Sequence, residues 1–66
     1  MNVKRITLDK LDYNTRELQD TQELYDESKD KLSKEANAFL RDKMSSYERN
    51  IEYYTEILKM LESEDK

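Results

Sequence analysis

Residues 40–61 read LRDKMSSYERNIEYYTEILKML, and this stretch carries the strongest structural signal in the chain. Its apolar positions recur at alternating steps of four and three residues without a break. They are Leu40, Met44, Tyr47, Ile51, Tyr54, Leu58 and Leu61. Such spacing is typical of the seam of an α-helix that packs against another helix. The stretch therefore predicts an all-α protein with these seven residues as a self-association seam.

The composition excludes the usual ways in which so short a chain is stabilised. The 66 residues include no Cys and no His, which excludes disulfides and the common zinc sites. A single domain of this length buries little apolar surface and generally needs a staple or a partner. Charged residues make up 42% of the chain, but the apolar residues gather on helical faces. We therefore expect an ordered chain whose stability depends on association.

Nothing in the sequence limits the length of the helices, because neither Gly nor Pro occurs. No apolar run approaches the roughly 20 residues that span a bilayer. The N-terminus also lacks the apolar core of a signal peptide. These features predict a soluble, cytoplasmic protein of one helical domain that has no membrane partner.

The first half of the chain carries a weaker heptad pattern. Apolar residues recur every seven positions, at Leu11, Leu18, Tyr25, Leu32 and Phe39. The companion row, taken three residues before each of them, contains Leu8, Thr15, Gln22, Lys29 and Ala36. One apolar and one largely polar row suit a helix with a single neighbour. Thr7 is a good N-cap residue, so this pattern predicts a lead segment over 1–6 and a helix over 7–32.

The two heptad patterns are out of step by one residue between Leu32 and Leu40. A turn or stutter over 33–36 accounts for this offset. A turn would give an antiparallel hairpin, with a second helix over 37–62 and a frayed tail over 63–66. A stutter would instead give one long helix of a coiled coil, about 80 Å in length.

We favour the hairpin because the two helical segments have nearly equal lengths. Ser33 can cap the second helix, and Asn37 tolerates the left-handed backbone of a reversal. This turn would place Leu18 opposite Ile51 or Tyr54.

The second helix has more apolar residues than one seam requires. Tyr53, Ile57 and Met60 form a further row at steps of four and three residues. A lone hairpin would leave this row in water, so we interpret it as a dimer or partner surface. The sequence thus predicts hairpins that pair as a dimeric four-helix bundle.

Signals for catalysis are weak. The absence of His and Cys removes the commonest acid–base group and the thiol nucleophile. The absence of Gly removes the loops that cradle phosphates or bind calcium. We therefore expect no enzyme activity, no cofactor and no metal. Asp20, Glu23, Glu27 and Asp30 share one helical face, which we interpret as an ordinary solvated surface.

The segment Val3–Leu8 alternates in polarity and is locally basic. It resembles the opening of ribbon-helix-helix repressors over about seven residues. In that family such a strand pairs with its dimer mate and enters the major groove. The resemblance implies Lys4, Arg5 and Thr7 as candidate DNA contacts, although the chain is net acidic, with a charge of −4.

Two functional hypotheses follow. The favoured one is a small, non-enzymatic helical interaction protein, such as a regulator, an inhibitor or an assembly adaptor. We expect its partner to be a second copy of the chain, and the alternative partner is another protein. The alternative is a DNA-binding repressor that uses the N-terminal segment.

Overall fold

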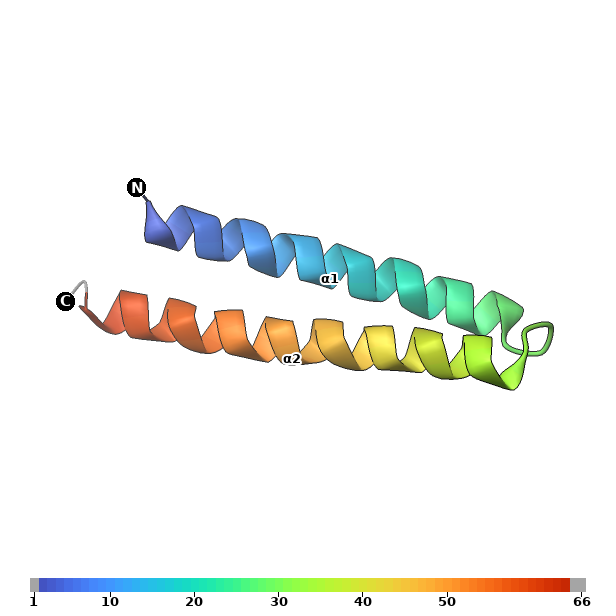
Figure 1. Ribbon diagram of the computed structural model, residues 1–66. Helices are drawn as coiled ribbons and strands as arrows, with labels where there is room; N and C mark the ends of the chain where they lie inside the picture. Colours follow the sequence, from blue (N-terminus) through green and yellow to red (C-terminus); the bar gives the residue numbers. More distant parts are fainter. Residues whose placement is uncertain (1, 65–66) are drawn as a thin grey trace.

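The computed structural model describes residues 2–64, which form two α-helices joined by a short turn. Helix α1 covers Val3–Ser28 and helix α2 covers Lys34–Glu64. The helices pack side by side, so the first turn of α1 and the last turn of α2 lie at the same end (Figure 1). The hairpin prediction is confirmed. A single long helix is excluded, since the longest dimension is 51 Å.

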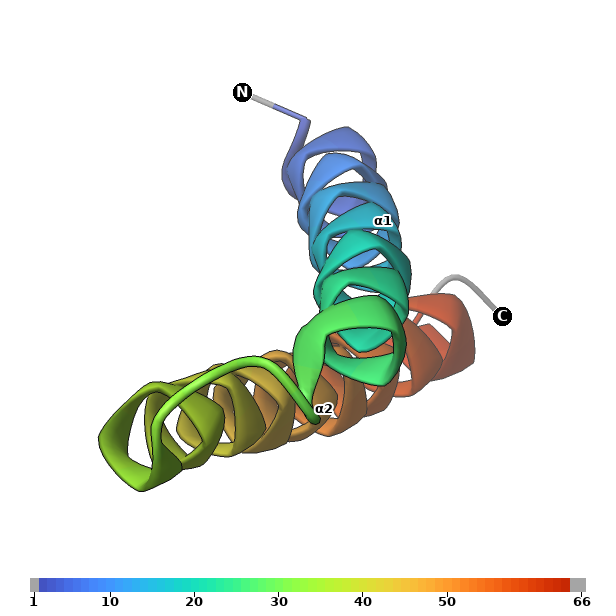
Figure 2. The same cartoon turned by 90° about the vertical axis from the view of Figure 1, so that its right-hand side faces the viewer.

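The two helix axes cross at an angle instead of running parallel, as the view along the hairpin shows (Figure 2). Such a crossing is expected where the facing residues repeat every seven positions, because that repeat winds slowly around each helix.

Helix α1 begins earlier than the sequence predicts. Asn2 is the N-cap, and its side-chain Oδ1 accepts a hydrogen bond from the backbone N–H of Arg5 at 3.0 Å. Thr7 is therefore not the cap: its hydroxyl donates to the carbonyl oxygen of Val3, one turn back, at 2.8 Å. Asn is at least as good a cap as Thr, so the helix extends through most of the expected lead segment.

The turn also comes earlier, over 29–33 and not over 33–36. The backbone N–H groups of Lys31 and Leu32 both donate to the carbonyl oxygen of Ser28, which ends α1. The side chain of Asn37 donates to the carbonyl oxygen of Lys29 at 2.9 Å and closes the turn from the other side. Residues 2–64 include no positive φ angle, so the reversal uses no left-handed residue at Asn37.

Helix α2 is longer at both ends than the predicted 37–62. The cap at Ser33 is confirmed, because its Oγ accepts a hydrogen bond from the N–H of Ala36 at 3.1 Å. Ser63 and Glu64 continue the helix instead of fraying. The last two residues of the expected tail, 65–66, lie outside the described residues.

Helix α2 presents its whole apolar seam to α1. Leu40 and Met44 are each only 9% exposed, and the other five seam residues are half-buried. Within residues 2–64, α1 is the only helix packed against α2. The seam predicted from residues 40–61 is thus occupied within the hairpin itself.

Helix α1 presents one apolar and one polar row to α2. Leu11, Leu18 and Tyr25 are half-buried, as expected. The second row is Thr7, Asn14, Thr21 and Ser28, all buried or half-buried. The expected companion row is wrong, since Leu8, Thr15, Gln22 and Lys29 are exposed. Small side chains fit against the large ones of α2, and local hydrogen bonds to the backbone satisfy Thr7 and Asn14.

A hydrogen bond between the helices sets their register. The Nδ2 of Asn50 donates to the Oδ1 of Asn14 at 3.0 Å. Leu18, four residues after Asn14, is therefore level with residue 46, next to Tyr47. The predicted pairing of Leu18 with Ile51 or Tyr54 is wrong, because the earlier turn shifts α2 by about one heptad.

Candidate interaction surface

Large apolar side chains remain exposed on both helices. Most of these residues come immediately before, in the sequence, a residue that faces the other helix. Leu8, which follows the inward-facing Thr7, and Leu32, which lies in the turn, stand apart from the others. The remaining seven and the half-buried Ile57 form a set of eight, which we name the apolar face. Its members are Val3, Ile6, Tyr13 and Leu24 on α1, and Phe39, Tyr53, Ile57 and Met60 on α2.

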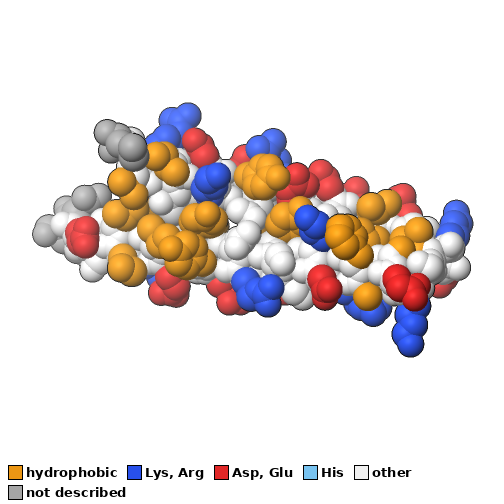
Figure 3. Space-filling view, in the orientation of Figure 1, with side chains coloured by type: hydrophobic (Ala, Val, Ile, Leu, Met, Phe, Trp, Pro, Cys, Tyr) orange, Lys and Arg blue, Asp and Glu red, His pale blue; other side chains and the backbone are white. Residues whose placement is uncertain are grey.

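These eight residues lie on one side of the hairpin. A residue that precedes a facing position is rotated by about 100° around its helix. In an antiparallel pair the same rotation leads to the same side on both helices. Figure 3 shows hydrophobic side chains gathered over both helices at the end opposite the turn, and a second group nearer the turn. Between the two groups the surface is mostly polar and charged, with a hydrophobic side chain on α1.

The predicted partner surface is part of this face. Tyr53 and Met60 are 63% and 62% exposed, whereas Ile57 is half-buried. The rings of Tyr53 and Tyr54 meet edge to face, with centroids 5.3 Å apart, so a seam residue supports the exposed ring. Sequence reasoning missed the α1 half of the face. The sequence signal for this half was that Ile6 and Tyr13 come directly before Thr7 and Asn14, two residues of the polar row that faces α2.

Tyr13 is 51% exposed on this face, and the pKa of its phenol is raised. The main cause is the negative charge of Glu17, one turn further along α1, which disfavours the phenolate. The ordinary pKa of a phenol is already near 10, so the hydroxyl is neutral at physiological pH with or without this shift.

The N-terminal segment does not form the strand that the repressor resemblance implies. It is the first two turns of α1, so it presents no extended edge for a dimer mate. Thr7 is only 4% exposed and cannot reach outward. Lys4 and Arg5 are exposed on the first turn, where the Nε of Arg5 lies 3.5 Å from a carboxylate oxygen of Asp9.

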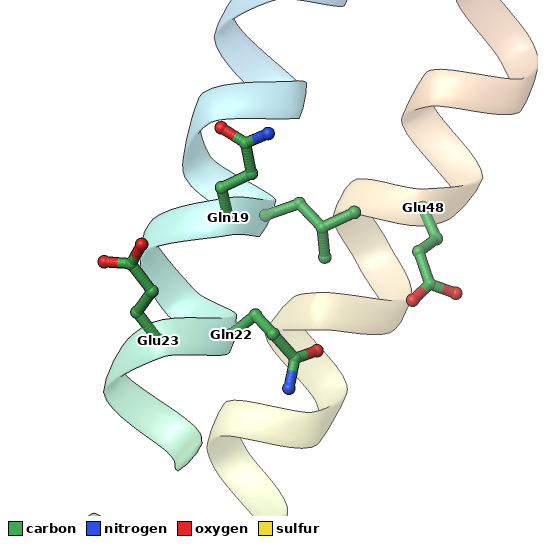
Figure 4. A pocket seen from close by; sticks show the side chains of 5 residues that line it. Gln19, Gln22, Glu23 and Glu48 are labelled. Carbon is green, nitrogen blue, oxygen red and sulfur yellow. The ribbon is translucent and has the colours of Figure 1, made fainter. Parts of the chain in front are cut away.

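A shallow hollow lies between the helices away from the apolar face. Gln19, Gln22 and Glu23 of α1 and Glu48 of α2 line it (Figure 4). Gln22 is already engaged, since its amide donates to Asp26 at 3.0 Å. The half-buried Leu18 also lines the hollow, and the exposed amides and carboxylates around it make no common centre, so this hollow carries no binding site.

The acidic residues are dispersed along the outside of the hairpin. Asp20, Glu23 and Glu27 lie exposed on α1, whereas Asp30 lies in the turn and not on the same helix face. Residues 2–64 include no group of three or more side chains arranged to hold a metal ion. No helix in this range is long and apolar enough to cross a membrane.

Comparisons of the chain with protein families, with characterised proteins and with solved structures give no match.

Proposed function

We propose that this chain is a non-enzymatic interaction protein, such as a regulator, an inhibitor or an assembly adaptor. It acts through protein contacts made by its helices. Two copies of the hairpin pack their apolar faces against each other and form a dimeric four-helix bundle. The observation that carries this proposal is the collection of large exposed apolar side chains on one side of both helices.

The exposed area supports a partner of about the size of the chain itself. The chain exposes 5391 Å² at a mass of 8.0 kDa. A compact monomer of this mass exposes about 4,450 Å². The excess of roughly 900 Å² is close to the ~800 Å² that each partner buries in a stable interface.

The interior of the hairpin supports the same proposal. In the described part of the chain only four side chains are buried, and two of these, Thr7 and Asn14, are polar. Burial of Leu40 and Met44 contributes about 1.5–3 kcal/mol each, which is small against the entropy of ordering some 60 residues. A second apolar layer is needed to offset that cost.

The proposal is tested by measuring molar mass with light scattering over a range of protein concentrations. The unaltered chain is expected to reach twice the mass of one chain. Ile57→Lys places an ammonium within the apolar face of each copy, at a cost of about 2 kcal/mol per site, and should weaken the dimer roughly a thousandfold.

Ser45→Lys is the matched control, because Ser45 is exposed on α2 away from the apolar face and the charge change is the same. It should leave the mass unchanged. A monomeric mass for the unaltered chain at every concentration would refute the dimer. Equal weakening by both variants would show that charge, and not the apolar face, controls association.

A further inference from the structure

The apolar face is divided into three bands along the hairpin, and their order points to one arrangement of two copies. The inference rests on the proposed dimer and deepens it. The register follows from the hydrogen bond between Asn14 and Asn50. Ile6, eight residues before Asn14, is level with residue 58 and therefore lies beside Ile57. Leu24, ten residues after Asn14, is level with residue 40 and lies beside Phe39.

The first band is broad and apolar and lies at the end opposite the turn. It contains Val3, Ile6, Tyr13, Tyr53, Ile57 and Met60, and the exposed Lys10 lies within it at the level of Tyr53. The third band, near the turn, is narrower and consists of Leu24 and Phe39, which are 53% and 60% exposed. Figure 3 shows the two apolar groups and the mostly polar and charged surface between them.

The middle band carries opposite charges on the two helices. Glu17 and Asp20 occupy it on α1, whereas Ser46 and Lys43 occupy it on α2. Asp20, six residues after Asn14, is level with residue 44 and so with Lys43. Neither Asp20 nor Lys43 belongs to one of the three ion pairs found in residues 2–64. The Nζ of Lys43 lies 5.6 Å from the centre of the Phe39 ring, which holds the cation at the face.

We propose that a second copy covers the apolar face with both turns at the same end, so that α1 of each copy lies over α2 of the other. The twofold axis then runs along the hairpin. Ile6 meets the partner's Ile57, and Leu24 meets the partner's Phe39. Asp20 meets the partner's Lys43, and symmetry makes this ion pair twice. Lys10, level with Tyr53, lies over the ring of the partner's Tyr53.

The opposite arrangement, with the turns at opposite ends and α1 over α1, fits less well. In that arrangement the broad apolar band of each copy packs on the narrow apolar band of the other copy. Val3 then lies over the level of Glu27, and Lys43 no longer lies over Asp20. An apolar side chain against a carboxylate leaves the carboxylate with less water and no partner, which weakens the dimer.

Distance measurements between spin labels test the orientation directly. The chain has no Cys, so Asp30→Cys gives one label at the turn of each copy. With the turns at the same end, neighbouring helices are about 10 Å apart, and the two labels should lie within roughly 30 Å of each other. With the turns at opposite ends, the labels would be separated by nearly the 51 Å length of the hairpin.

Ser45→Cys is the matched control, because a label near the middle of the hairpin gives a short distance in either orientation. A short distance at Ser45 with a long one at Asp30 would overturn this orientation and leave the proposed dimer standing. Absence of any dipolar signal at both positions, in protein as concentrated as the mass measurement requires, would overturn the dimer as well.

Exchange of the charges provides a second test. Asp20→Lys and Lys43→Asp should each weaken the dimer several-fold, since each brings like charges together across the interface. The double variant should regain most of the affinity, because it restores the pair with reversed signs. Failure of the double variant to regain affinity would overturn the proposed contact between Asp20 and the partner's Lys43.

Discussion

Replacement of Asn14 by Leu is expected to stabilise the hairpin, although it removes the hydrogen bond that sets the register. Asn14 is 4% exposed and lies in the polar row of α1. It accepts from the Nδ2 of Asn50 at 3.0 Å and donates to the carbonyl oxygen of Lys10 at 2.8 Å. Asn50 is an exposed residue, so water can replace its lost partner. The carbonyl of Lys10 keeps its bond to the helical backbone.

The expected magnitude follows from two opposing terms. Loss of the hydrogen bond costs about 1 kcal/mol. Burial of a Leu side chain of similar branching gains about 2 kcal/mol. The net gain of about 1 kcal/mol corresponds to a rise in Tm of roughly 4–8 °C for a domain of this size. The register should become less specific at the same time, because an apolar side chain accepts several neighbours equally well.

The assay is thermal unfolding followed by circular dichroism, at matched protein concentration because association adds to apparent stability. Asn50→Ala is the comparison variant: it breaks the same bond without adding apolar burial and should lower the Tm. If Asn14→Leu lowers the Tm as far as Asn50→Ala does, the reasoning is refuted, and the polar pair is worth more than apolar burial.

Two further predictions concern the turn and the apolar face. Ser33→Ala removes the hydroxyl that caps α2 and should lower the free energy of unfolding, measured in urea, by about 1 kcal/mol. Ser33→Asp keeps an acceptor and should lower it little. Equal losses of stability in the two variants would contradict the cap. The phenol of Tyr13 has a raised pKa when folded, so its stabilising contribution is full below the ordinary value near 10 and is lost as the pH rises through the folded pKa. Glu17→Gln should lower this pKa, as measured by phenolate absorbance with Tyr13→Phe as the reference, and an unchanged pKa would show that Glu17 is not its cause.

Much of the architecture was predictable because α2 carries a complete heptad of apolar residues. The seam from Leu40 to Leu61 faces α1 as the spacing indicates, and Ser33 caps α2 as its hydroxyl allows. Helix boundaries were less predictable. Asn2 and Thr7 are both suitable N-cap residues for α1. Asn2 is the cap because its side-chain oxygen accepts from a free backbone N–H, whereas the hydroxyl of Thr7 donates to a backbone carbonyl.

The inward row of α1 was not predictable from hydrophobicity. Leu8 is more apolar than Thr7, yet Thr7 is buried and Leu8 is 43% exposed. A row of Thr, Asn, Thr and Ser gives no apolar signal, and its role depends on the large residues of the opposite helix. The register error had the same origin, since the bond between Asn14 and Asn50 joins residues 36 positions apart.

The spacing of residues along the chain is enough to establish that it is helical, that α2 carries a seam, and that Tyr53, Ile57 and Met60 lie outside that seam. These properties depend on residues at most seven positions apart, and the helical period relates such residues directly. The tertiary structure alone decided which side of α1 turns inward and where the chain reverses. Both depend on pairing between the helices, and that pairing brings Val3, Ile6, Tyr13 and Leu24 to the same side as the α2 residues and joins the two sets into one face.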